Sequence, residues 1–541
     1  MGVPGLLSWL DNASKKTVDI RVNVKGAVTA YFFDMNSLLH DVAKAINVDF
    51  NNVSAYGDAV VAAVTAIIDK VQKPKYLFLC VDGAPPIAKL VDQRYRRYKA
   101  ASTVPRYDAG FHITVGTQFM IKFDMYMKDW VARGASFLSD NIIYSGHMVP
   151  GEGEYKIFQY IRSNKYPTDG SYIIEGADAD LLIISMALGS SKQLLLHRPL
   201  PIKDKGKGKE RGEYVSSGKI RDYIPKPMTF VVLSMFVGND FLPGTPTTTT
   251  LRQCMNFLYD LSKDKAYDGI IDAKGEVNWL RYLPLLRKMS ESEEYLMSER
   301  SKEEIAAARR ETSPGQKEHK HQYLPGITEP TFELFRIEWY RSSVAPLKQV
   351  NQEYIDDMCR RWLRMFQWCM RYYVAGTYTE EYYPYRVAPT LHDLYAYLSK
   401  LNDPKTVLGV PYVDRYPIPI HPLAQLACVI PPEYSRVIPE GEIADIVSSK
   451  SVSGFSDLLP MQVTIDMRGI FAWNDHAAKP KMSAPDFNRW RRYVAGMTKD
   501  EPSPFESAVE KTGILRSGTR TIVNAEFSES EDWNALMSEP L

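Results

Sequence analysis

Seven acidic residues in the first half of the chain have types and positions that suggest a metal-binding or catalytic site. They are Asp34, Asp82, Glu152, Glu154, Asp178, Asp180 and Asp240. They lie where apolar runs such as YLFLCV and VVLSMFV end, or in glycine-containing segments such as PGEGE. One aspartate at such a place usually only caps a helix or starts a turn. Seven of them in this order indicate a carboxylate cluster instead.

A cluster of this size predicts the binding of divalent metal ions. Neighbouring carboxylates cannot all ionise without cations, because each raises the pKa of the others. Hard oxygen ligands suit Mg²⁺ or Mn²⁺. Two such ions can activate a water and stabilise the leaving oxygen of a phosphodiester. We therefore expect all seven residues to serve as metal ligands and catalytic groups of a two-ion hydrolytic site.

The segment after Asp82 predicts a helix with one basic face. Lys89, Gln93, Arg96 and Arg97 follow one another at i, i+4, i+7 and i+8, which places them together on a helix. Residues 89–106 hold six Lys or Arg and one Asp, in a chain whose formal net charge is +1. Arginine forks bind phosphate oxygens at two points. The four residues predict a terminal-phosphate site, and a solvated face is less favoured because no Glu stands at i±4.

The remaining candidate near these motifs is His40, six residues after Asp34 on the expected next helix. It could stack on a base or contact phosphate. A core or capping histidine is the alternative.

Strands alternate with helices over the first ~250 residues, which predicts an α/β fold. The expected strands are 27–33, 76–81, 141–144, 172–174 and 193–196, with helical patterns at 59–71 and 113–132. We expect a mostly parallel central sheet with helices on both faces. Ligands of such sheets bind beyond the carboxyl ends of the strands, which is where the acidic residues lie.

The rest of the chain suggests further parts. The expected divisions are 1–265, the nuclease domain; 266–330, a charged helix and linker; 331–516, a mixed, aromatic-rich second domain; and 517–541, a flexible tail. With 45% hydrophobic and 24% charged residues, the composition is globular. The five cysteines form no CxxC pair, so we expect reduced thiols. No apolar run reaches the ~18 residues of a membrane span.

In their order, these motifs resemble the Xrn family of 5′→3′ exoribonucleases. The similar segments are MGVPGLLSWL, FFDMNSLLH, VDGAPPIAKLVDQRYRRY, VPGEGEYKI, GADADLLI and FVGNDFLP, and more loosely RYYVAGTYTEEYYPYRVAPTLHDL, HPLAQLACVIPPE and VTIDMRGIFAW. The resemblance spans roughly residues 1–500. It implies a flap-nuclease-like (PIN) fold, with the second region packed over the active site.

The resemblance also implies an activity and its site. The family degrades single-stranded RNA processively from a 5′-monophosphate end to 5′-mononucleotides, using divalent metal. The seven acids would hold two Mg²⁺ (or Mn²⁺) ions. Lys89, Gln93, Arg96 and Arg97 would bind the 5′-phosphate, and His40 would stack on the first base. RNA as the substrate and the 5′→3′ direction come from the resemblance alone.

The sequence also departs from the family pattern. The family usually has tryptophans just before its Tyr-Tyr-Pro-Tyr stretch, and one of them faces the histidine across the base. Here residues 376–381 (GTYTEE) hold no Trp, so Tyr378 or Tyr382 would take that place, and Tyr382 is the candidate we retain. Trp473 matches a family tryptophan. The chain resembles a short, catalytic-core member, such as a viral one.

Two other functions remain as alternatives. A flap-type structure-specific DNA nuclease shares the MGVPGL start and the paired aspartates, and a catalytically lost RNA-binding scaffold would keep only the binding surface. We expect a monomer without membrane association. The missing basic bipartite signal favours the cytoplasm over the nucleus.

Overall fold

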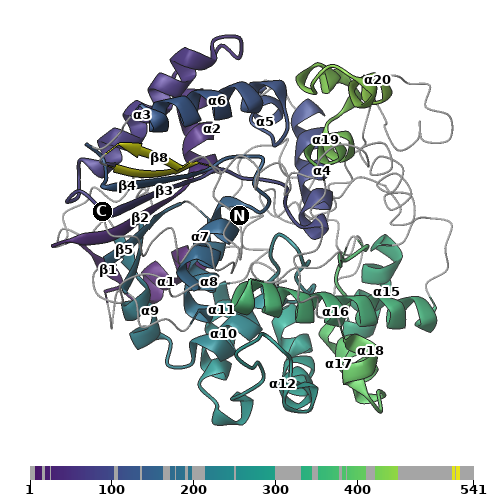
Figure 1. The fold of residues 1–541 in the computed structure, drawn as a ribbon. Helices are drawn as coiled ribbons and strands as arrows, with labels where there is room; N and C mark the ends of the chain where they lie inside the picture. The colour runs from purple at the N-terminus through teal and green to yellow at the C-terminus, as the bar shows by residue number, and fades with distance from the viewer. Residues whose placement is uncertain are drawn as a thin grey trace, which may run out of the picture. The chain divides into compact units, whose positions relative to one another are not determined.

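The structure is a computed structural model, in which the chain forms two compact units (Figure 1). It describes residues 6–14, 19–24, 26–102, 108–133, 137–162, 171–176, 178–188, 193–197, 214–248, 252–298, 331–343, 351–376, 381–385, 387–409, 421–448, 514–517 and 519–523. We call Asp19–Ile220, Tyr416–Val463 and Pro485–Leu541 the sheet unit. Met1–Val18, Arg221–Arg415 and Thr464–Ala484 form the helical unit.

The sheet unit is built on a nine-stranded sheet in the order β1-β7-β6-β5-β2-β3-β4-β9-β8. The strands are β1 (Arg21–Val22), β2 (Val28–Asp34), β3 (Tyr76–Cys80), β4 (Asn141–Ser145), β5 (Ser171–Glu175), β6 (Gln193–His197), β7 (Tyr214–Ser216), β8 (Ile514–Ser517) and β9 (Thr519–Val523). The run from β6 to β9 is parallel, and only β1/β7, β7/β6 and β8/β9 pair antiparallel. All five predicted strands are confirmed.

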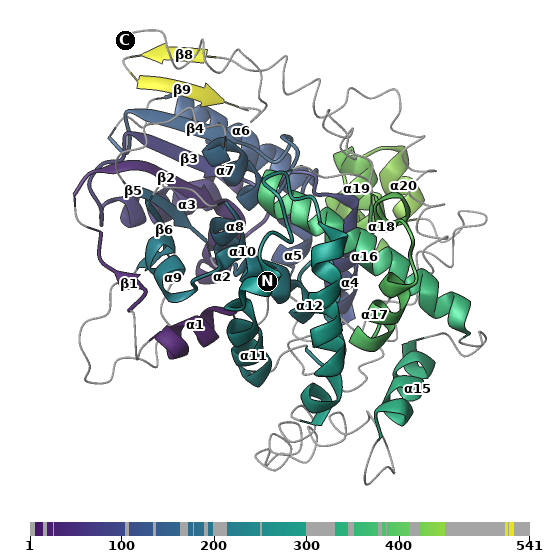
Figure 2. The same ribbon diagram turned by 90° about the horizontal axis from the view of Figure 1, so that it is seen from below.

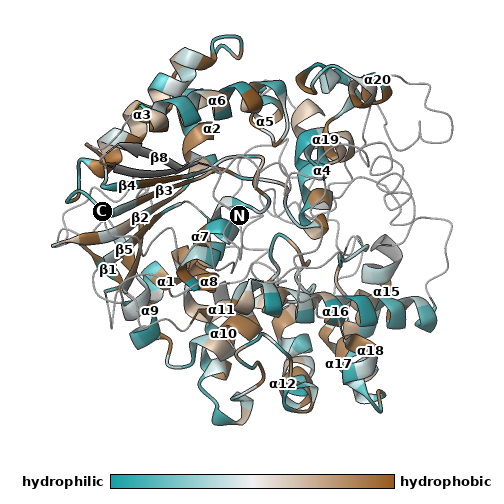
Figure 3. Cartoon of the chain, viewed as in Figure 1, coloured by the Kyte–Doolittle hydropathy of each residue, from teal (hydrophilic) through white to brown (hydrophobic). Residues whose placement is uncertain are grey.

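Helices cover both faces of this sheet, as the alternating pattern predicts. On one face, Tyr31 and Phe33 share a core with residues of α2 (Met35–Ala45), α3 (Val53–Ile68) and α6 (Gln118–Ala132). On the other, Phe32 and Phe78 pack against Tyr160 of α7 (Gly153–Arg162). Successive strand residues point to opposite faces, so one apolar run supplies both cores. α8 (Asp180–Ala187) is brown over most of its length in Figure 3, and all of its residues are buried.

The last strands come from the far end of the sequence. β9 pairs in parallel with β4, and β8 forms a hairpin with β9 (Figure 2). The predicted tail from residue 517 therefore contains a strand, formed by the β-branched run Thr-Arg-Thr-Ile-Val. Residues 524–541 lie outside the described part of the chain.

A segment of the predicted second domain also belongs to the sheet unit. It holds α19 (Pro422–Val429), a 3₁₀ turn η4 (Pro432–Val437) and α20 (Glu442–Ser448). α19 packs against α4 (Ile87–Ser102), and Tyr434 stacks on Phe111 of α5 (Ala109–His112) with ring centroids 3.6 Å apart. This segment therefore supports the basic helix, although more than 300 residues separate the partners in sequence.

The helical unit is helical or irregular over its described residues, apart from one β-bridge between Ile271 and Val277. Trp9 stacks on Phe230, and Trp362 and Trp368 of the long α16 are fully buried. Its elements are α1 (Leu6–Ser14), α10 (Pro227–Ser234), η2 (Met235–Val237), α11 (Arg252–Ser262), η3 (Lys265–Tyr267), α12 (Trp279–Glu291), α15 (Phe332–Ser343), α16 (Gln352–Ala375), α17 (Leu391–Ser399) and α18 (Pro404–Leu408), while α9 (Ser217–Tyr223) starts in the sheet unit. The described parts of the second region, 331–516, are mainly helical, and its residues 514–516 belong to strand β8 of the sheet unit.

Of the predicted charged helix and linker (266–330), residues 299–330 lie outside the described part. No described helix combines the length and the hydrophobicity needed to cross a bilayer.

Candidate active site

Parallel strands bring six of the seven predicted acids to one unit. Asp34 is the last residue of β2, and Asp82 follows β3. β4 leads through a turn to Glu152 and to Glu154 in the first turn of α7. Asp178 and Asp180 lie between β5 and α8. Because β2 pairs in parallel with β3 and β5, the carboxyl ends of these strands lie along one edge.

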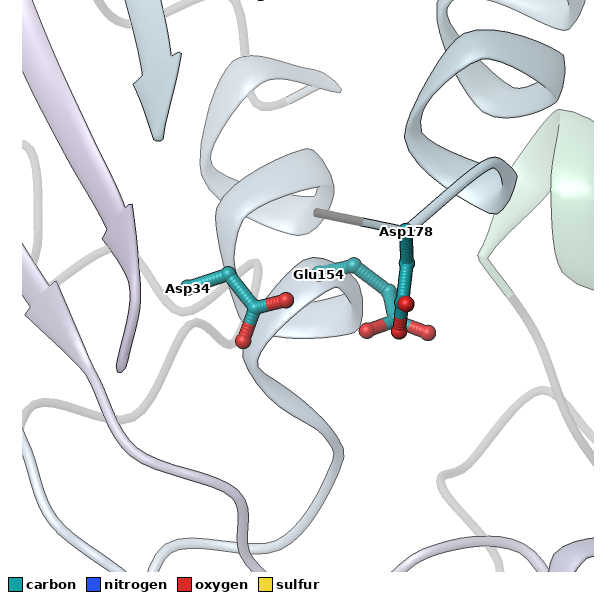
Figure 4. A group of neighbouring side chains, drawn as sticks. All are labelled: Asp34, Glu154 and Asp178. Atoms are coloured by element: carbon teal, nitrogen blue, oxygen red, sulfur yellow. The ribbon is translucent and has the colours of Figure 1, made fainter. Parts of the chain in front are cut away.

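Three carboxylates form the core of the site (Figure 4). One oxygen each of Asp34, Glu154 and Asp178 lies within 4.8 Å of the others. Asp34 and Glu154 are buried, and the Oδ1 atom of Asp34 has no hydrogen-bond partner. Burial together with neighbouring carboxylates raises the pKa of both groups well above the usual range.

Such an arrangement is suited to a cation. A buried carboxylate oxygen without a donor is costly in a protein alone. A divalent ion would satisfy that oxygen and offset the mutual repulsion of the three charges. Hard oxygen donors are the ligands of Mg²⁺ and Mn²⁺. The residues present therefore fit a divalent metal ion.

Asp82 is held in place by two donors that the sequence analysis did not identify. Its Oδ2 atom accepts a hydrogen bond from Asn36 Nδ2 at 2.6 Å, and its Oδ1 atom accepts one from the Gly153 amide at 2.7 Å. The Asp82 amide in turn donates to Asn36 Oδ1 at 3.2 Å. Burial raises the pKa of Asp82, while the Gly153 amide, Lys89 and Lys156 act against that rise. The side chain is thus fixed beside the three-carboxylate core.

Glycines are required in the turn segments because neighbouring atoms lie too close to their Cα atoms to leave room for a side chain. A Cβ on Gly153 would lie 2.4 Å from Asp34 Oδ1, and one on Gly83 would lie 1.7 Å from the Val149 carbonyl oxygen. The Gly83 amide donates to the Gly151 carbonyl at 2.8 Å, which ties the loop after β3 to the loop after β4. Gly151 itself has φ = +95°, a value that favours glycine. The PGEGE spacing thereby places Glu152 and Glu154 around Asp34.

A buried lysine supports the same two loops. Lys156 Nζ donates to the carbonyls of Val81 and Gly146, at 2.6 and 2.9 Å. These carbonyls belong to the loops that carry Asp82 and Glu152. No local sequence pattern indicates this role, because a lysine at the start of an amphipathic helix is usually exposed.

The basic face predicted on α4 is present and is joined to the acidic cluster. Lys89 Nζ pairs with Glu152 Oε1 at 3.0 Å, with each side chain only 5% exposed. Arg97 donates from Nε and Nη2 to Thr114 Oγ1 (3.2 and 2.9 Å) and from Nη1 to the Gln93 carbonyl (3.2 Å). These bonds hold the arginine beside Gln93 on one side of the helix.

The positive charge of this face is partly balanced, contrary to what the absence of Glu at i±4 suggests. Asp92 stands four residues before Arg96 and pairs with its Nε at 2.8 Å. An aspartate at that spacing neutralises a helical arginine as a glutamate would. Arg96 is thus partly engaged by its own helix.

His40 on α2 lies close to the basic set. Burial, Arg97, Arg96 and Lys44, in that order, lower the pKa of His40 to about 4. The imidazole is therefore neutral at physiological pH, which suits a ring that stacks on a base. The stacking itself stays a prediction.

Three predicted residues are not placed at the cluster. Asp180 is buried at the start of α8 but does not belong to the three-carboxylate core. Asp240 is buried in the helical unit, after η2, where Asn239 Oδ1 accepts from the amides of Phe241 and Leu242. Tyr382 is half-buried in the same unit. Their contributions stay predictions, and Tyr378 and Trp473 lie outside the described residues.

The sequence of this chain matches two family models and several known proteins. Residues 1–109 and 105–198 match the family model for the XRN 5′-3′ exonuclease N-terminus, and 228–331 and 333–496 match the Xrn1 helical domain. The human protein "5'-3' exoribonuclease 1" is 24% identical over 544 residues, covering 81% of this chain and 31% of that protein. The Saccharomyces cerevisiae protein of the same name is 29% identical over 312 residues (47% and 20%).

A Drosophila melanogaster protein, "5'-3' exoribonuclease 2 homolog", is 23% identical over 645 residues, covering 89% of this chain and 69% of that protein. The chain spans about a third or less of the human and yeast relatives. Both family models match in the expected order and together cover most of the sequence. This chain therefore belongs to the Xrn family of 5′–3′ exonucleases.

Proposed function

We propose that this chain is a metal-dependent 5′→3′ exoribonuclease. It would remove 5′-mononucleotides one at a time from single-stranded RNA that carries a 5′-monophosphate. The observation that carries the proposal is the Lys89–Glu152 pair, because it joins a buried carboxylate cluster to a basic helix face. A site for cutting a phosphodiester would thus lie beside a site for a terminal phosphate. The names of the relatives, 5'-3' exoribonuclease 1 and 2, agree with this assignment.

The carboxylates would hold two Mg²⁺ ions. Within the sheet unit, Asp34, Glu154 and Asp178 would supply the innermost oxygens, and Asp82, Glu152 and Asp180 would complete the set. When bound, the ions supply an activated water and stabilise the 3′ oxygen that leaves. The chain's own part is to fix the ligand geometry: Asn36 and the Gly153 amide orient Asp82. Lys156 keeps the two ligand-bearing loops together.

The basic face would define the RNA end. A terminal phosphate accepts hydrogen bonds from Arg97, Arg96, Gln93 and Lys89, and arginine forks bind its oxygens in pairs. A 5′-hydroxyl has no charge for these groups to bind, and a triphosphate or cap is larger than the set can surround. The neutral His40 ring would stack on the first base.

Cleavage would then depend on where the bound 5′-phosphate places the first internucleotide bond. With the 5′-phosphate held on α4, the first internucleotide phosphate reaches the carboxylate cluster. Water adds to phosphorus, the bond to the 3′ oxygen breaks, and a 5′-mononucleotide leaves. The shortened RNA carries a new 5′-monophosphate, which explains processive action.

The chemistry of the RNA end provides the test. One oligonucleotide would be offered as 5′-monophosphate RNA, 5′-triphosphate RNA, 5′-hydroxyl RNA and 5′-monophosphate DNA, each with Mg²⁺ and with chelator. We expect Mg²⁺-dependent mononucleotide release chiefly from 5′-monophosphate RNA. Internal cuts, or a preference for branched DNA, would favour a flap-type nuclease. Binding without cleavage under both Mg²⁺ and Mn²⁺ would favour a scaffold.

A further inference from the structure

Helix α19 contributes a buried side chain to the basic face of α4. Gln425, which is fully buried, donates from Nε2 to Gln93 Oε1 at 3.1 Å. Close by, Arg94 Nη1 donates to the Cys428 carbonyl at 2.8 Å, so the two helices are joined at two points. Both helices belong to the sheet unit and lie side by side in Figures 1 and 2.

This contact determines which end of the Gln93 amide is available. A glutamine amide has one end that accepts and one that donates. The oxygen and the nitrogen diverge by about 120° from the same planar carbon. With Oε1 directed at Gln425, the amine of Gln93 is directed away from α19. A phosphate ion only accepts hydrogen bonds, so glutamine can bind it only through that amine.

The neighbouring arginine is oriented in a similar way. Thr114 Oγ1 donates to the Gly110 carbonyl and accepts from Arg97 Nε and Nη2. The third bond, from Arg97 Nη1 to the Gln93 carbonyl, leaves two of the five guanidinium N–H groups for a ligand. Gln93 and Arg97 are thus both fixed by residues outside α4, with their remaining donors free to act together.

We propose that Gln425 is a positioning residue for recognition of the RNA 5′-phosphate. It keeps the Gln93 amide in the orientation that donates. The inference rests on the proposed function, since it needs a 5′-phosphate as the ligand. Gln425 acts through Gln93 and does not itself contact the RNA.

Two substitutions of Gln425 test this directly. Gln425→Met keeps the length of the side chain and removes the donor, so the Gln93 amide becomes free to rotate. Gln425→Glu presents only acceptors, which turns the Gln93 amine toward α19 and its carbonyl toward the phosphate. Gln118→Glu is the matched control, because Gln118 lies on α6 and its Nε2 donates to the Ile438 carbonyl of the same segment at 3.4 Å. Thermal melting verifies that each variant folds.

The measured quantity is the ratio of affinities for 5′-monophosphate and 5′-hydroxyl RNA. It is obtained by fluorescence anisotropy in chelator, so that it does not depend on cleavage. A hydrogen bond to a charged group predicts a roughly tenfold fall of this ratio for Gln425→Glu and about threefold for Gln425→Met. The Gln118→Glu ratio should equal that of the wild type. With Mg²⁺, KM for 5′-monophosphate RNA should rise while kcat stays close to the wild-type value.

A double-mutant cycle separates orientation from general damage. In a Gln93→Ala background, Gln425→Met should cause no further loss, because there is no amide left to orient. Equal losses in both backgrounds, or an unchanged ratio for folded Gln425→Glu, would overturn the inference. A wild-type protein without any 5′-monophosphate preference would instead refute the proposed function, so the two failures are distinguishable.

Discussion

Replacing Asp34 by asparagine should stabilise the metal-free protein while abolishing its response to metal. The substitution keeps the shape of the side chain and removes one charge from the core formed with Glu154 and Asp178. Because their oxygens lie within 4.8 Å, two such charges repel by about 3 kcal/mol at an effective dielectric constant of ~20. Partial protonation reduces this value, so we expect a gain of about 2 kcal/mol, or roughly 4–8 °C in Tm.

The pH dependence of the wild type supplies a second part of the same prediction. Burial raises the pKa of Asp34 and of Glu154 in the folded state, whereas the unfolded chain titrates near 4. The folded protein then binds more protons than the unfolded chain above about pH 4, so metal-free stability falls as pH rises through that range. Asp34→Asn should flatten this fall.

Thermal melting in chelator and in Mg²⁺ measures both effects. Wild-type Tm should rise with Mg²⁺, because an ion at 100 times its Kd adds about 2.7 kcal/mol, and the variant should gain much less. Asp129→Asn is the control, since Asp129 is 65% exposed on α6 and its carboxylate pairs with the exposed Arg133. Its Tm should change little. If Asp34→Asn melted below wild type in chelator and kept the full Mg²⁺ gain, Asp34 would not belong to a repelling, metal-binding cluster.

Three further predictions concern the supporting residues. Gly153→Ala should reduce the single-turnover cleavage rate about 100-fold and weaken Mg²⁺ binding, because the new Cβ would lie 2.4 Å from Asp34 Oδ1; a wild-type rate would contradict this. Lys156→Met should lower the free energy of unfolding by about 2–3 kcal/mol in chemical denaturation, since it leaves two buried carbonyls without a donor; a loss below about 0.5 kcal/mol would show that those bonds contribute little. The His40 imidazole should titrate near pH 4 by NMR in the RNA-free protein, and a midpoint above 6 would place it away from the basic set.

The parts of the fold carried by local patterns could be predicted from the sequence. Each of the five apolar runs is a strand because burial on both faces of a parallel sheet requires continuous apolar residues. The short strands β1 and β7 have two and three residues, which is too few for a pattern. Many aromatic residues of the second region fall on helices such as α16, which composition alone could not indicate because it does not record their spacing.

The site also contains residues that the sequence predicts and residues that it does not. Its carboxylates and basic residues could be identified because their types and spacing carry the chemistry. The residues that hold them could not be, because their partners are distant in sequence. The Asn36 side chain donates a hydrogen bond to Asp82, and the Gln425 side chain donates one to Gln93, which lies 332 positions earlier in the sequence. Nothing in the local sequence around either residue indicates such a contact.

The most direct test of the central claim is the first product released from a single-stranded RNA labelled in its 5′-phosphate. Purified wild-type protein would be incubated with it in Mg²⁺, with Asp178→Ala as the control for contaminating nucleases. We expect a labelled 5′-mononucleotide as the first product of the wild type. Asp178→Ala should bind the RNA without cleaving it. Label released in longer fragments would exclude 5′→3′ exonuclease action, and cleavage by Asp178→Ala at the wild-type rate would exclude the proposed metal site.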